Sequence, residues 1–325
     1  TYKFNLYKGR IYDMQLEMRY VYQIYLDGSF SKAAKSLYIT QPALSMAIQK
    51  VEADIGMPIF DRSTRPLTLT HAGHIYINTI KDIMLLEDNL HNHINDIQNL
   101  KCGSLILGGT HYINAHILPD ILPGFISCYP NIDIRVLEHG SSILIHMLEE
   151  HQLDFYFSCD PNLIASFPGY KLFSDQLLLA VPESYDINKK LSNYSFSATD
   201  ICKLAHLSEK HPAISLSAFK DVPFLLLFNG SNFYERATNM FQEAGLSPNI
   251  KMQLSQSVTA FRFAAAGLGA TFVVDRLVKE SDNRLKYYKI DSPHAKRHNY
   301  LLHPKQKYVT AAMSAFVQYI SKNFS

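Results

Sequence analysis

The sequence predicts an α + α/β protein: a helical N-terminal part, one long linking helix and an α/β C-terminal part. Residues 28–55 hold two helical patterns separated by a tight turn. Residues 76–97 place apolar side chains at heptad spacing. From residue 104 onward, short apolar runs alternate with helical patterns, which is typical of α/β domains. At 325 residues, the chain is long enough for two or three domains with sizeable cores.

The segment from Gly28 to Ile55 predicts a helix-turn-helix. A first helix should end at Gly28, because glycine tolerates the left-handed conformation that ends many helices. Ser31 is a suitable N-cap for a second, short helix, and Thr40 for a third. The third helix should bury four apolar residues at helical spacing: Leu44, Ile48, Val51 and Ile55. Its other face carries small polar side chains, and such a helix fits the major groove of DNA.

A short hairpin is predicted directly after this helix. Gly56 should end the helix, residues 58–62 should form a strand, residues 63–66 a turn and residues 67–69 the returning strand. Arg65 would then stand near the tip of the hairpin. A hairpin with an arginine near its tip, directly after a helix that reads DNA, is typical of the wing in a winged helix-turn-helix.

A long helix should follow the wing, with Thr70 as its N-cap. Its apolar positions repeat at close to heptad spacing: Tyr76, Ile80, Ile83, Leu86, Leu90, Ile94 and Ile97. Such a stripe can lie on the core of its own domain or form the seam of a dimer. The length of the helix and its position between two domains favour the dimer, which would also place two reading helices on two half-sites of DNA.

The C-terminal part predicts two α/β lobes. In the first lobe we expect strands at 105–108, 132–137 and 155–158 and helices at 114–129 and 142–150. In the second lobe we expect strands at 177–181, 224–228, 250–254 and 270–274 and helices at 231–244 and 257–266. Strands near 285–290 and 299–303 and a helix from about 307 to 323 complete the chain. The predicted lobes therefore span about 104–175 with 285–325, and about 176–284.

Several motifs stand in the order and spacing of the LysR-type transcriptional regulators, and the chain resembles that family. These motifs are Ser29-Phe30-Ser31 with Ala33-Ala34, Gln41-Pro42-Ala43-Leu44-Ser45, Glu52 with Gly56, Phe60 with Arg62, and Leu69-Thr70 with Ala72-Gly73. The resemblance implies a winged helix-turn-helix at 14–73 (helix-turn-helix about 31–55, wing 58–70), a dimerising linker helix at 74–101 and an effector-binding domain at 102–325. That domain would have a two-lobed, periplasmic-binding-protein-like fold. Residues 1–13 precede the family pattern as an extension or an expression remnant.

The resemblance also assigns DNA contacts by position. Base contacts fall to Gln41, Pro42 and Ser45, with Gln49 further along the helix. Phosphate contacts fall to Ser29, Ser31, Lys32, Thr40 and Arg62, and Arg65 would enter the minor groove from the wing. Many relatives carry Arg or Lys directly after the serine, where this chain has Met46, so their half-site preference is not carried over. Because the net charge is only +2, the DNA interpretation depends on the motif rather than on bulk charge.

Ligands of α/β lobes bind beyond the C-terminal ends of strands, near helix N-termini that favour anions. Three stretches fall there, at 108–112, 140–142 and 229–232, and Ser158 should lie where the chain first crosses between the lobes. The expected effector contacts are Thr110, His111, Tyr112, Ser141, Ser142, Ser158, Asn229, Gly230 and Ser231. Small hydroxyls and glycines at helix starts are also ordinary caps. Three equivalent stretches favour a pocket.

The sequence Thr110-His111, with Ala115 downstream, is similar to the sulfur-metabolism regulators of the family. Those relatives continue with a second threonine, where this chain has Tyr112. An aromatic side chain would shrink or reshape the pocket, so we assign no sulfate-type effector.

Other chemistries have weaker support. The sequence contains no nucleophile elbow, Walker phosphate loop or dinucleotide fingerprint, so we predict no enzyme activity and no cofactor. The 14 histidines lack partners at metal-ligand spacing, so we expect no metal site. Four cysteines lie far apart, as expected for reduced thiols in a cytoplasmic protein: Cys102, Cys128, Cys159 and Cys202. No apolar run reaches the length of a membrane span.

The sequence therefore predicts a transcriptional regulator that binds promoter DNA as a dimer or a dimer of dimers. A small effector, with an anion as one option, would bind between the lobes and change their relative angle. RNA polymerase is a further expected partner. Two alternatives stay open: a solute-binding module whose N-terminal helices only dimerise, and a DNA-binding regulator switched by cysteine oxidation or by protein contacts. The effector, the target genes and the direction of regulation are not encoded in these patterns.

Overall fold

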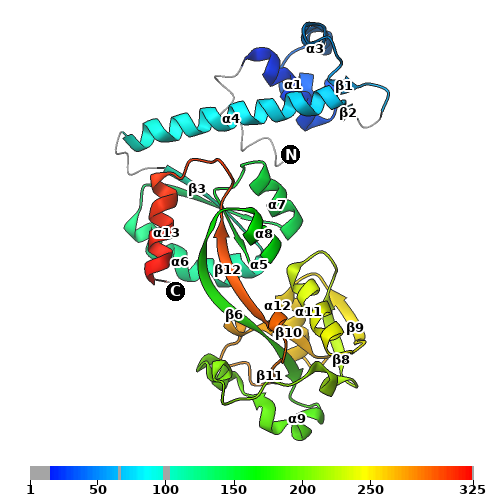
Figure 1. The fold of residues 1–325 in the computed structure, drawn as a ribbon, viewed down its shortest axis with the longest axis vertical. Helices are drawn as coiled ribbons and strands as arrows, with labels where there is room; N and C mark the ends of the chain where they lie inside the picture. The colour runs from blue at the N-terminus through cyan, green and yellow to red at the C-terminus, as the bar shows by residue number, and fades with distance from the viewer. Residues whose placement is uncertain (1–14, 65–66, 98–102, 324–325) are drawn as a thin grey trace. The chain divides into compact units, whose positions relative to one another are not determined.

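The computed structural model describes residues 15–64, 67–97 and 103–323. The chain divides into two compact units, Thr1–Leu100 and Lys101–Ser325 (Figure 1). The elements of the first unit are α1 (Leu16–Asp27), α2 (Phe30–Ser36), α3 (Gln41–Ile55), β1 (Phe60–Asp61), β2 (Thr68–Leu69) and α4 (His71–Ile97). No helix in the described part of the chain has the length and apolar character that crossing a membrane requires.

The N-terminal unit has one core, to which every helix and the hairpin contribute. Its buried side chains include Val21, Ile24, Ala33, Leu44, Ile48, Ile59, Phe60, Ile77 and Ile80. Ile80 therefore packs inside its own domain, although we predicted it in the dimer seam. Leu86, Leu90 and Ile94 further along α4 are exposed, and among the described side chains of the predicted seam these are the ones most open to another chain.

The ends of α1 and α3 are as predicted. Gly28 and Gly56 follow the two helices in the left-handed conformation, with φ of 60° and 77°. The Thr40 hydroxyl accepts a hydrogen bond from the Ala43 amide at 3.4 Å, which caps α3. The turn between α2 and α3 is tight because Tyr38 itself adopts a positive φ of 57°. The cap at Thr40 and the backbone conformation of Tyr38 therefore shape the turn between α2 and α3.

Some details of this unit differ from the prediction. Ser29, whose backbone is extended, is the N-cap of α2, whereas we predicted Ser31. Ile55 is 41% exposed because the last turn of α3 runs past the core, so the buried stripe ends at Val51. The wing strands pair over two residues each, which is shorter than predicted. Arg65, predicted near the wing tip, lies outside the described residues.

Two α/β lobes form the C-terminal unit. The first lobe contains β3 (Gly103–Gly109), α5 (His111–His116), α6 (Leu118–Cys128), β4 (Ile132–Glu138), α7 (Ser141–Glu149), β5 (Phe155–Ser158), α8 (Pro161–Ser166), β12 (Lys296–Leu302) and α13 (Ala311–Asn323). The second lobe contains helices α9 (Ile187–Lys190), α10 (Ala198–Cys202), α11 (Asn232–Glu243) and α12 (Ser257–Ala265) and strands β7 (Ser195–Phe196), β8 (Pro223–Leu227), β9 (Asn249–Leu254), β10 (Thr271–Val274) and β11 (Leu285–Lys289). Short 3₁₀ helices lie at Ser192–Tyr194, Ala205–Leu207, Leu216–Phe219, Asp275–Leu277 and Pro293–Ala295.

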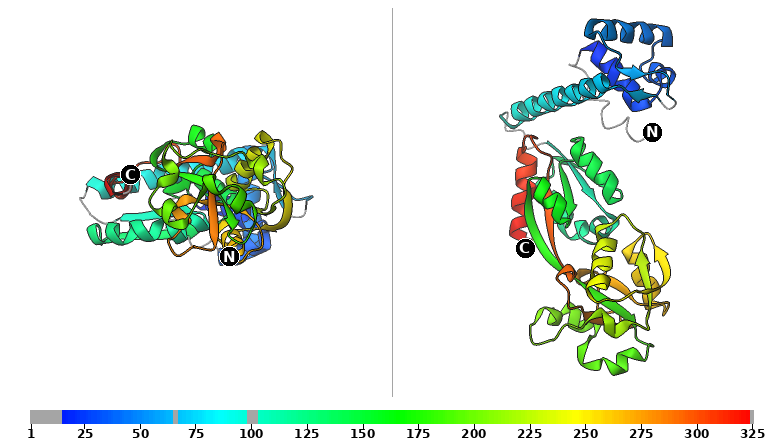
Figure 2. Two further views of the ribbon diagram at one scale, coloured as in Figure 1. Left: turned by 90° about the horizontal axis from the view of Figure 1, so that it is seen from below. Right: turned by 45° about the vertical axis from the view of Figure 1, so that its right-hand side comes forward.

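One mixed sheet runs through both lobes in the order β4-β3-β5-β12-β6-β11-β7, with β10 also paired to β6. β3 pairs in parallel with β4 and β5, and β8 with β9, as the alternating pattern predicted. Helices lie on both faces of the first-lobe sheet, and α13 packs beside α6 against β3 (Figure 2). The C-terminal ends of β3, β4 and β5 therefore open toward one edge of the first lobe.

The strand β6 (Gly169–Pro182) joins the two lobes. Its first half pairs with β12, and its second half pairs with β10 and β11. We predicted that the chain returns to the first lobe from residue 285, but β11 pairs with the second half of β6 and with β7. The return therefore begins at β12, and two segments cross between the lobes: β6, and the stretch from β11 to β12.

Other differences concern short elements. The helix predicted at 114–129 is two helices, α5 and α6, which break at Ile117 ahead of Pro119. Pro119 then occupies the first turn of α6, where a missing N–H is tolerated. The last helix begins at Ala311 rather than near 307. The segment 183–222 forms short helices and one short strand that no periodic pattern marked.

A Gly73→Ala substitution tests the packing of α4 on the wing. A Cβ at Gly73 would meet the Ile59 carbonyl oxygen, which is backbone and cannot turn aside. We expect a loss of about 1–3 kcal/mol in the free energy of unfolding of the N-terminal unit, as for other overpacked sites. Gly140→Ala is the control, because nothing lies within 4 Å of a Cβ there. Chemical denaturation that finds both variants equally stable would contradict this packing.

Candidate functional site

The outer face of α3 carries the side chains that we predicted to reach bases. Gln41, Pro42 and Gln49 are exposed, Ser45 is half-buried, and Met46 is 69% exposed between them. The Ser31 hydroxyl donates a hydrogen bond to Gln41 Oε1 at 2.8 Å. The carboxamide oxygen of Gln41 is thus engaged, which leaves its N–H groups as donors for a base edge.

The carboxylate of Glu52 fixes the wing against α3. Glu52 Oε1 accepts hydrogen bonds from the amides of Ile59 and Phe60, at 2.9 and 3.3 Å. Glu52 Oε2 accepts one from Arg62 Nη2 at 2.8 Å, and the Arg62 guanidinium lies 5.1 Å from the centre of the Phe30 ring. Arg62 therefore ties the wing to both helices, and its predicted phosphate contact would have to use its remaining donors.

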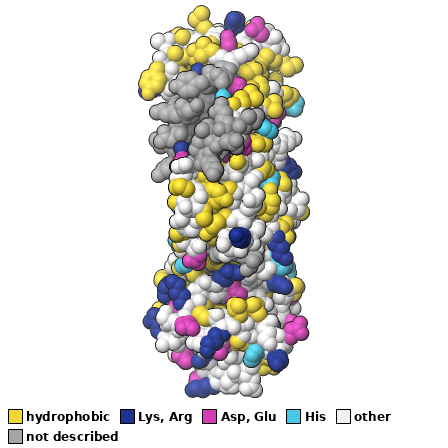
Figure 3. Space-filling view, turned by 90° about the vertical axis from the view of Figure 1, so that its left-hand side faces the viewer, with side chains coloured by type: hydrophobic (Ala, Val, Ile, Leu, Met, Phe, Trp, Pro, Cys, Tyr) yellow, Lys and Arg dark blue, Asp and Glu magenta, His cyan; other side chains and the backbone are white. Residues whose placement is uncertain are grey.

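The other predicted phosphate contacts surround this face. Lys32 and Thr40 are exposed, Ser31 is exposed and bonded to Gln41, and Ser29 is half-buried at the start of α2. On the face of the C-terminal unit that Figure 3 draws, Lys and Arg side chains are mixed with Asp and Glu. The DNA interpretation therefore continues to depend on the shape of the N-terminal unit and not on an overall basic surface.

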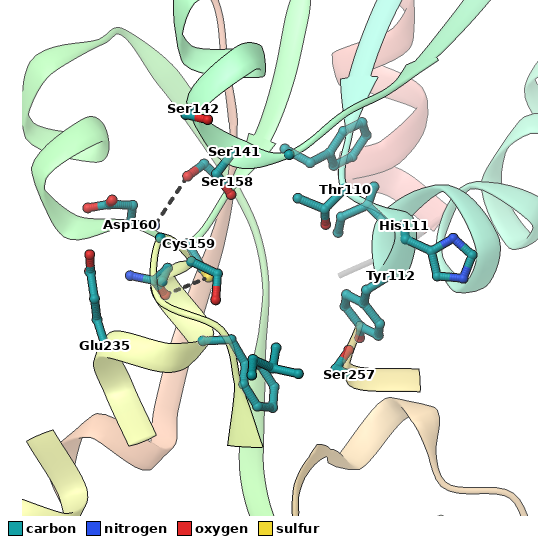
Figure 4. A pocket seen from close by; sticks show the side chains of 18 of the residues that line it. Thr110, His111, Tyr112, Ser141, Ser142, Ser158, Cys159, Asp160, Glu235 and Ser257 are labelled. Carbon is teal, nitrogen blue, oxygen red and sulfur yellow. Dashed lines mark hydrogen bonds between the residues drawn. The ribbon is translucent and has the colours of Figure 1, made fainter. Parts of the chain in front are cut away.

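A cavity of about 460 Å³ opens between the two lobes of the C-terminal unit (Figure 4). All nine predicted effector residues line it: Thr110, His111, Tyr112, Ser141, Ser142, Ser158, Asn229, Gly230 and Ser231. They come from the ends of β3, β4, β5 and β8, where the topology brings successive loops to one edge. The structure thus brings these residues together, while their contact with a ligand stays a prediction.

Three helices of eight or more residues begin at this cavity. Gly140 and Gln256, the N-caps of α7 and α12, supply no side-chain cap, so the first amides of both helices are free of such bonds. At α11, the Ser231 hydroxyl accepts a hydrogen bond from the Tyr234 amide at 3.1 Å. The two uncapped starts, one in each lobe, are the stronger positions for an anionic group.

His111 was expected to face a ligand. Its Nδ1 lies 3.1 Å from the Glu138 carboxylate, which directs that nitrogen toward the exposed end of β4. His111 therefore lines the cavity with one ring nitrogen already engaged.

Several lining residues were not predicted. They include Tyr156, Cys159, Asp160, Glu235, Ser257, Arg297 and Asn299. Ser257 opens a helix after a strand, so the rule that found Ser231 would also have found it. Arg297 and Asn299 lie on β12, which begins before the strand predicted near 299–303. Nothing in the local sequence marks which side chains of this returning strand line a cavity.

Arg297 is held by a buried carboxylate. Its Nε and Nη2 donate to Asp175 Oδ1 and Oδ2, both at 2.6 Å, and Asn299 Nδ2 donates to Asp175 Oδ2 at 3.0 Å. Burial alone would lower the pKa of Arg297, but the charge of Asp175 raises it above the usual range. The one arginine among the described residues that line the cavity is therefore charged and already paired.

Tyr112 lies over this ion pair. The Arg297 guanidinium is 5.7 Å from the centre of its ring. The Tyr112 hydroxyl is buried and has no hydrogen-bond partner among the described residues. Burial, reinforced by Asp175, raises the pKa of this phenol, so it stays protonated at neutral pH and can only be satisfied by an acceptor or by water.

Arg236 ties α11 to the crossing between the lobes. Its Nε donates to Asn232 Oδ1 at 2.7 Å, and its Nη2 donates to the Cys159 carbonyl at 3.1 Å. Its Nη1 donates to the carbonyls of His294 and Lys296, at 3.0 and 3.1 Å. Burial lowers the pKa of Arg236, and no carboxylate among the described residues is hydrogen-bonded to it to offset this effect.

Metal and redox sites gain no support in the described residues. No group of three or more His, Cys, Asp or Glu side chains there could hold a metal ion. Cys128, Cys159 and Cys202 are free thiols, and Cys128 and Cys202 are exposed. Cys159 Sγ lies 3.3 Å from Asn232 Oδ1 at the cavity wall. Cys102 lies outside the described residues.

A winged helix-turn-helix with an exposed third helix, joined to a two-lobed domain with a cleft, is the architecture of a DNA-binding transcription regulator with a substrate-binding domain. Residues 16–74 match the family model of the bacterial regulatory helix-turn-helix protein, lysR family, and residues 98–325 match the LysR substrate binding domain. The chain belongs to the LysR family of transcriptional regulators.

Relatives of similar length support this membership. The transcriptional regulator YybE of Bacillus subtilis is 27% identical over 295 residues, which cover 91% of this chain and 94% of that protein. A probable RuBisCO transcriptional regulator of Cyanidioschyzon merolae is 29% identical over 309 residues, covering 93% of this chain and 95% of that protein.

Solved structures show the same fold. Full-length CbnR in complex with its target DNA has a TM-score of 0.59 at 19% identity, covering 95% of this chain and 99% of that one. HinK of Pseudomonas aeruginosa has a TM-score of 0.56 at 20% identity, covering 95% of this chain and 98% of that one.

Asp175→Asn tests the buried pair. We expect a loss of about 3–5 kcal/mol in the free energy of unfolding of the C-terminal unit, because Arg297 would keep its charge without a counter-charge. Asp186→Asn removes an exposed pair with Lys189 and should leave stability nearly unchanged. Denaturant titration that ranks the two variants equally would show that the buried pair is not what holds β6 to β12.

Proposed function

We propose that a small molecule bound between the lobes controls how this LysR-type regulator binds promoter DNA. The observation that carries the proposal is the cavity itself. Loops from both lobes line it, while the lobes are joined through two crossing segments. A ligand that touches both walls binds one arrangement of the lobes more tightly than another, and that difference in affinity is what shifts the equilibrium.

DNA would be read by α3. Gln41, Pro42 and Ser45 would face base edges in the major groove, and Gln49 would follow along the helix. Lys32, with the hydroxyls of Ser29, Ser31 and Thr40, would hold the phosphates. From the wing, Arg62 would contact a phosphate and Arg65 would enter the minor groove.

The working state would be a dimer or a dimer of dimers. The far part of α4 supports this proposal, because Leu86, Leu90 and Ile94 are exposed apolar residues at near-heptad spacing. Two copies would present two reading helices to two half-sites. RNA polymerase, as a further partner at the promoter, and the cytoplasm, as the place of action, belong to the same proposal.

The alternatives that the sequence left open weigh less. A solute-binding module whose helices only dimerise would not need the helix-turn-helix that matches the regulators. A switch by cysteine oxidation would depend on Cys159, whose thiol lines the cavity, or on Cys202. Neither thiol lies in a disulfide, and we keep ligand control as the proposed function.

Selection of bound duplexes from a random library, at two salt concentrations, tests DNA reading. We expect a two-fold interrupted palindrome whose enrichment falls as salt rises. Lys32→Ala should lower the slope of log affinity against log salt concentration by about one unit for each bound half-site, because one phosphate contact is lost. The preferred DNA sequence should be unchanged. Gln41→Ala should alter the preferred bases.

Lys189→Ala is the matched control, since Lys189 is an exposed lysine of the C-terminal unit. If neither Lys32→Ala nor Gln41→Ala differs from this control, the proposed DNA surface is wrong.

A further inference from the structure

The charges around the cavity do not suit a purely anionic ligand. Among the described lining residues, the only Lys or Arg is Arg297, and Asp175 neutralises it. Two carboxylates, Asp160 and Glu235, line the same cavity without an ion pair to any described residue. A dianion would therefore meet two like charges and no unpaired Lys or Arg among the described lining residues.

These two carboxylates come from opposite lobes. Asp160 follows β5 in the first lobe, and one of its oxygens caps the Asn162 amide at 2.9 Å. Glu235 lies in the first turn of α11 in the second lobe and is exposed. In Figure 4, the Glu235 side chain points from α11 toward the side of the cavity where Asp160 lies. A cationic group placed there would contact both lobes at once.

The other end of the cavity offers donors. The Tyr112 side chain points from α5 toward Ser257 at the start of α12 (Figure 4). Its hydroxyl is buried without a partner among the described residues, and α12 has no side-chain cap at its N-terminus. A carboxylate placed there would accept from the phenol and from the free amides of α12.

Apolar side chains also line the cavity. They include Ile145, Leu163, Leu227, Phe228 and Phe233. Phe228 is 54% exposed, which is unusual for phenylalanine at the end of a buried strand. Burying this ring under an aliphatic chain would add a favourable apolar contact.

We infer that the effector is a small amino carboxylate whose ammonium group lies between Asp160 and Glu235 and whose carboxylate lies at Tyr112 and the start of α12. This inference rests on the proposed function, since it specifies the ligand of the same cleft. The net charge of such a ligand is zero, which matches a cavity with acceptors at one end and donors at the other. At the carboxylate end, the Tyr112 hydroxyl has no partner among the described residues, and at the ammonium end neither Asp160 nor Glu235 has an ion pair with one of them.

Thermal unfolding of the full chain, followed by calorimetric titration, tests the inference with defined probes. The panel is the standard amino acids, the ω-amino acids from glycine through aminohexanoate, and matched monocarboxylates, amines and dicarboxylates. We expect at least one amino carboxylate to raise the unfolding temperature and to bind about tenfold or more tightly than its matched carboxylate, as loss of a charge-assisted bond implies.

Variants locate the two ends. Glu235→Gln should weaken the binding of the amino carboxylate about tenfold and leave the binding of the matched carboxylate unchanged. Tyr112→Phe should weaken both compounds, because it removes a donor to their common group. Glu209→Gln, an exposed glutamate of the second lobe outside the cavity, is the control and should change neither.

The inference is overturned if dicarboxylates or plain carboxylates bind as tightly as amino carboxylates, or if no member of the panel stabilises the chain. The proposed function has a separate test, because the library selection does not use the panel. A dicarboxylate that stabilises the chain and alters its DNA binding would contradict the inferred ligand class but support the proposed control of DNA binding by a ligand. An amino carboxylate that binds without any effect on DNA binding would support the ligand class and contradict the proposed function.

Discussion

The buried ion pair between Asp175 and Arg297 is the constraint on which the effector domain depends. The two residues are directly opposed on β6 and β12, the strands that carry the chain between the lobes. A guanidinium and a carboxylate at 2.6 Å, away from water, are tolerable only when both are paired, so the register of these strands is fixed. Arg297 forms part of the cavity wall, and Asp175 behind it cancels its charge there. The pair therefore sets both the geometry of the crossing and the electrostatics that a ligand meets.

Glu52 has an equivalent role in the N-terminal unit. One carboxylate on α3 accepts from two amides of the wing and from Arg62, which in turn covers Phe30 of α2. The buried side of α3 and its exposed reading face are thus oriented together with the wing. This explains why the glutamate, the phenylalanine and the arginine stand at fixed spacings in the sequence. Part of the motif that suggested DNA binding is, in physical terms, the set of contacts that holds the wing against α2 and α3.

Local chemistry made most of the fold predictable. Gly28, Gly56 and Thr40 mark helix ends through conformations and bonds that involve only near neighbours, and the structure agrees with each. The nine residues predicted to contact an effector converge because strand ends share one edge, which is a consequence of topology. Arg297 and Glu235 could not be found in this way, since their role depends on pairing across 122 residues and on the charges of the opposite lobe. The predicted return to the first lobe at residue 285 was wrong for the same reason, because the pairing of β11 with β6 and β7 joins residues far apart in the chain.

The arrangement around Glu235 connects the cavity to the crossing. Arg236, the next residue on α11, donates to the Cys159 carbonyl at the end of β5 and to two carbonyls that precede and begin β12. The proposed ligand at Glu235 would therefore act on a helix that is bonded to the first lobe and to the stretch between β11 and β12. Coupling between sites is typically about 1–3 kcal/mol, which is no more than one or two such bonds. Because Arg236 has no carboxylate hydrogen-bonded to it, these carbonyl bonds compensate its burial, and a shift of α11 has to rearrange them together.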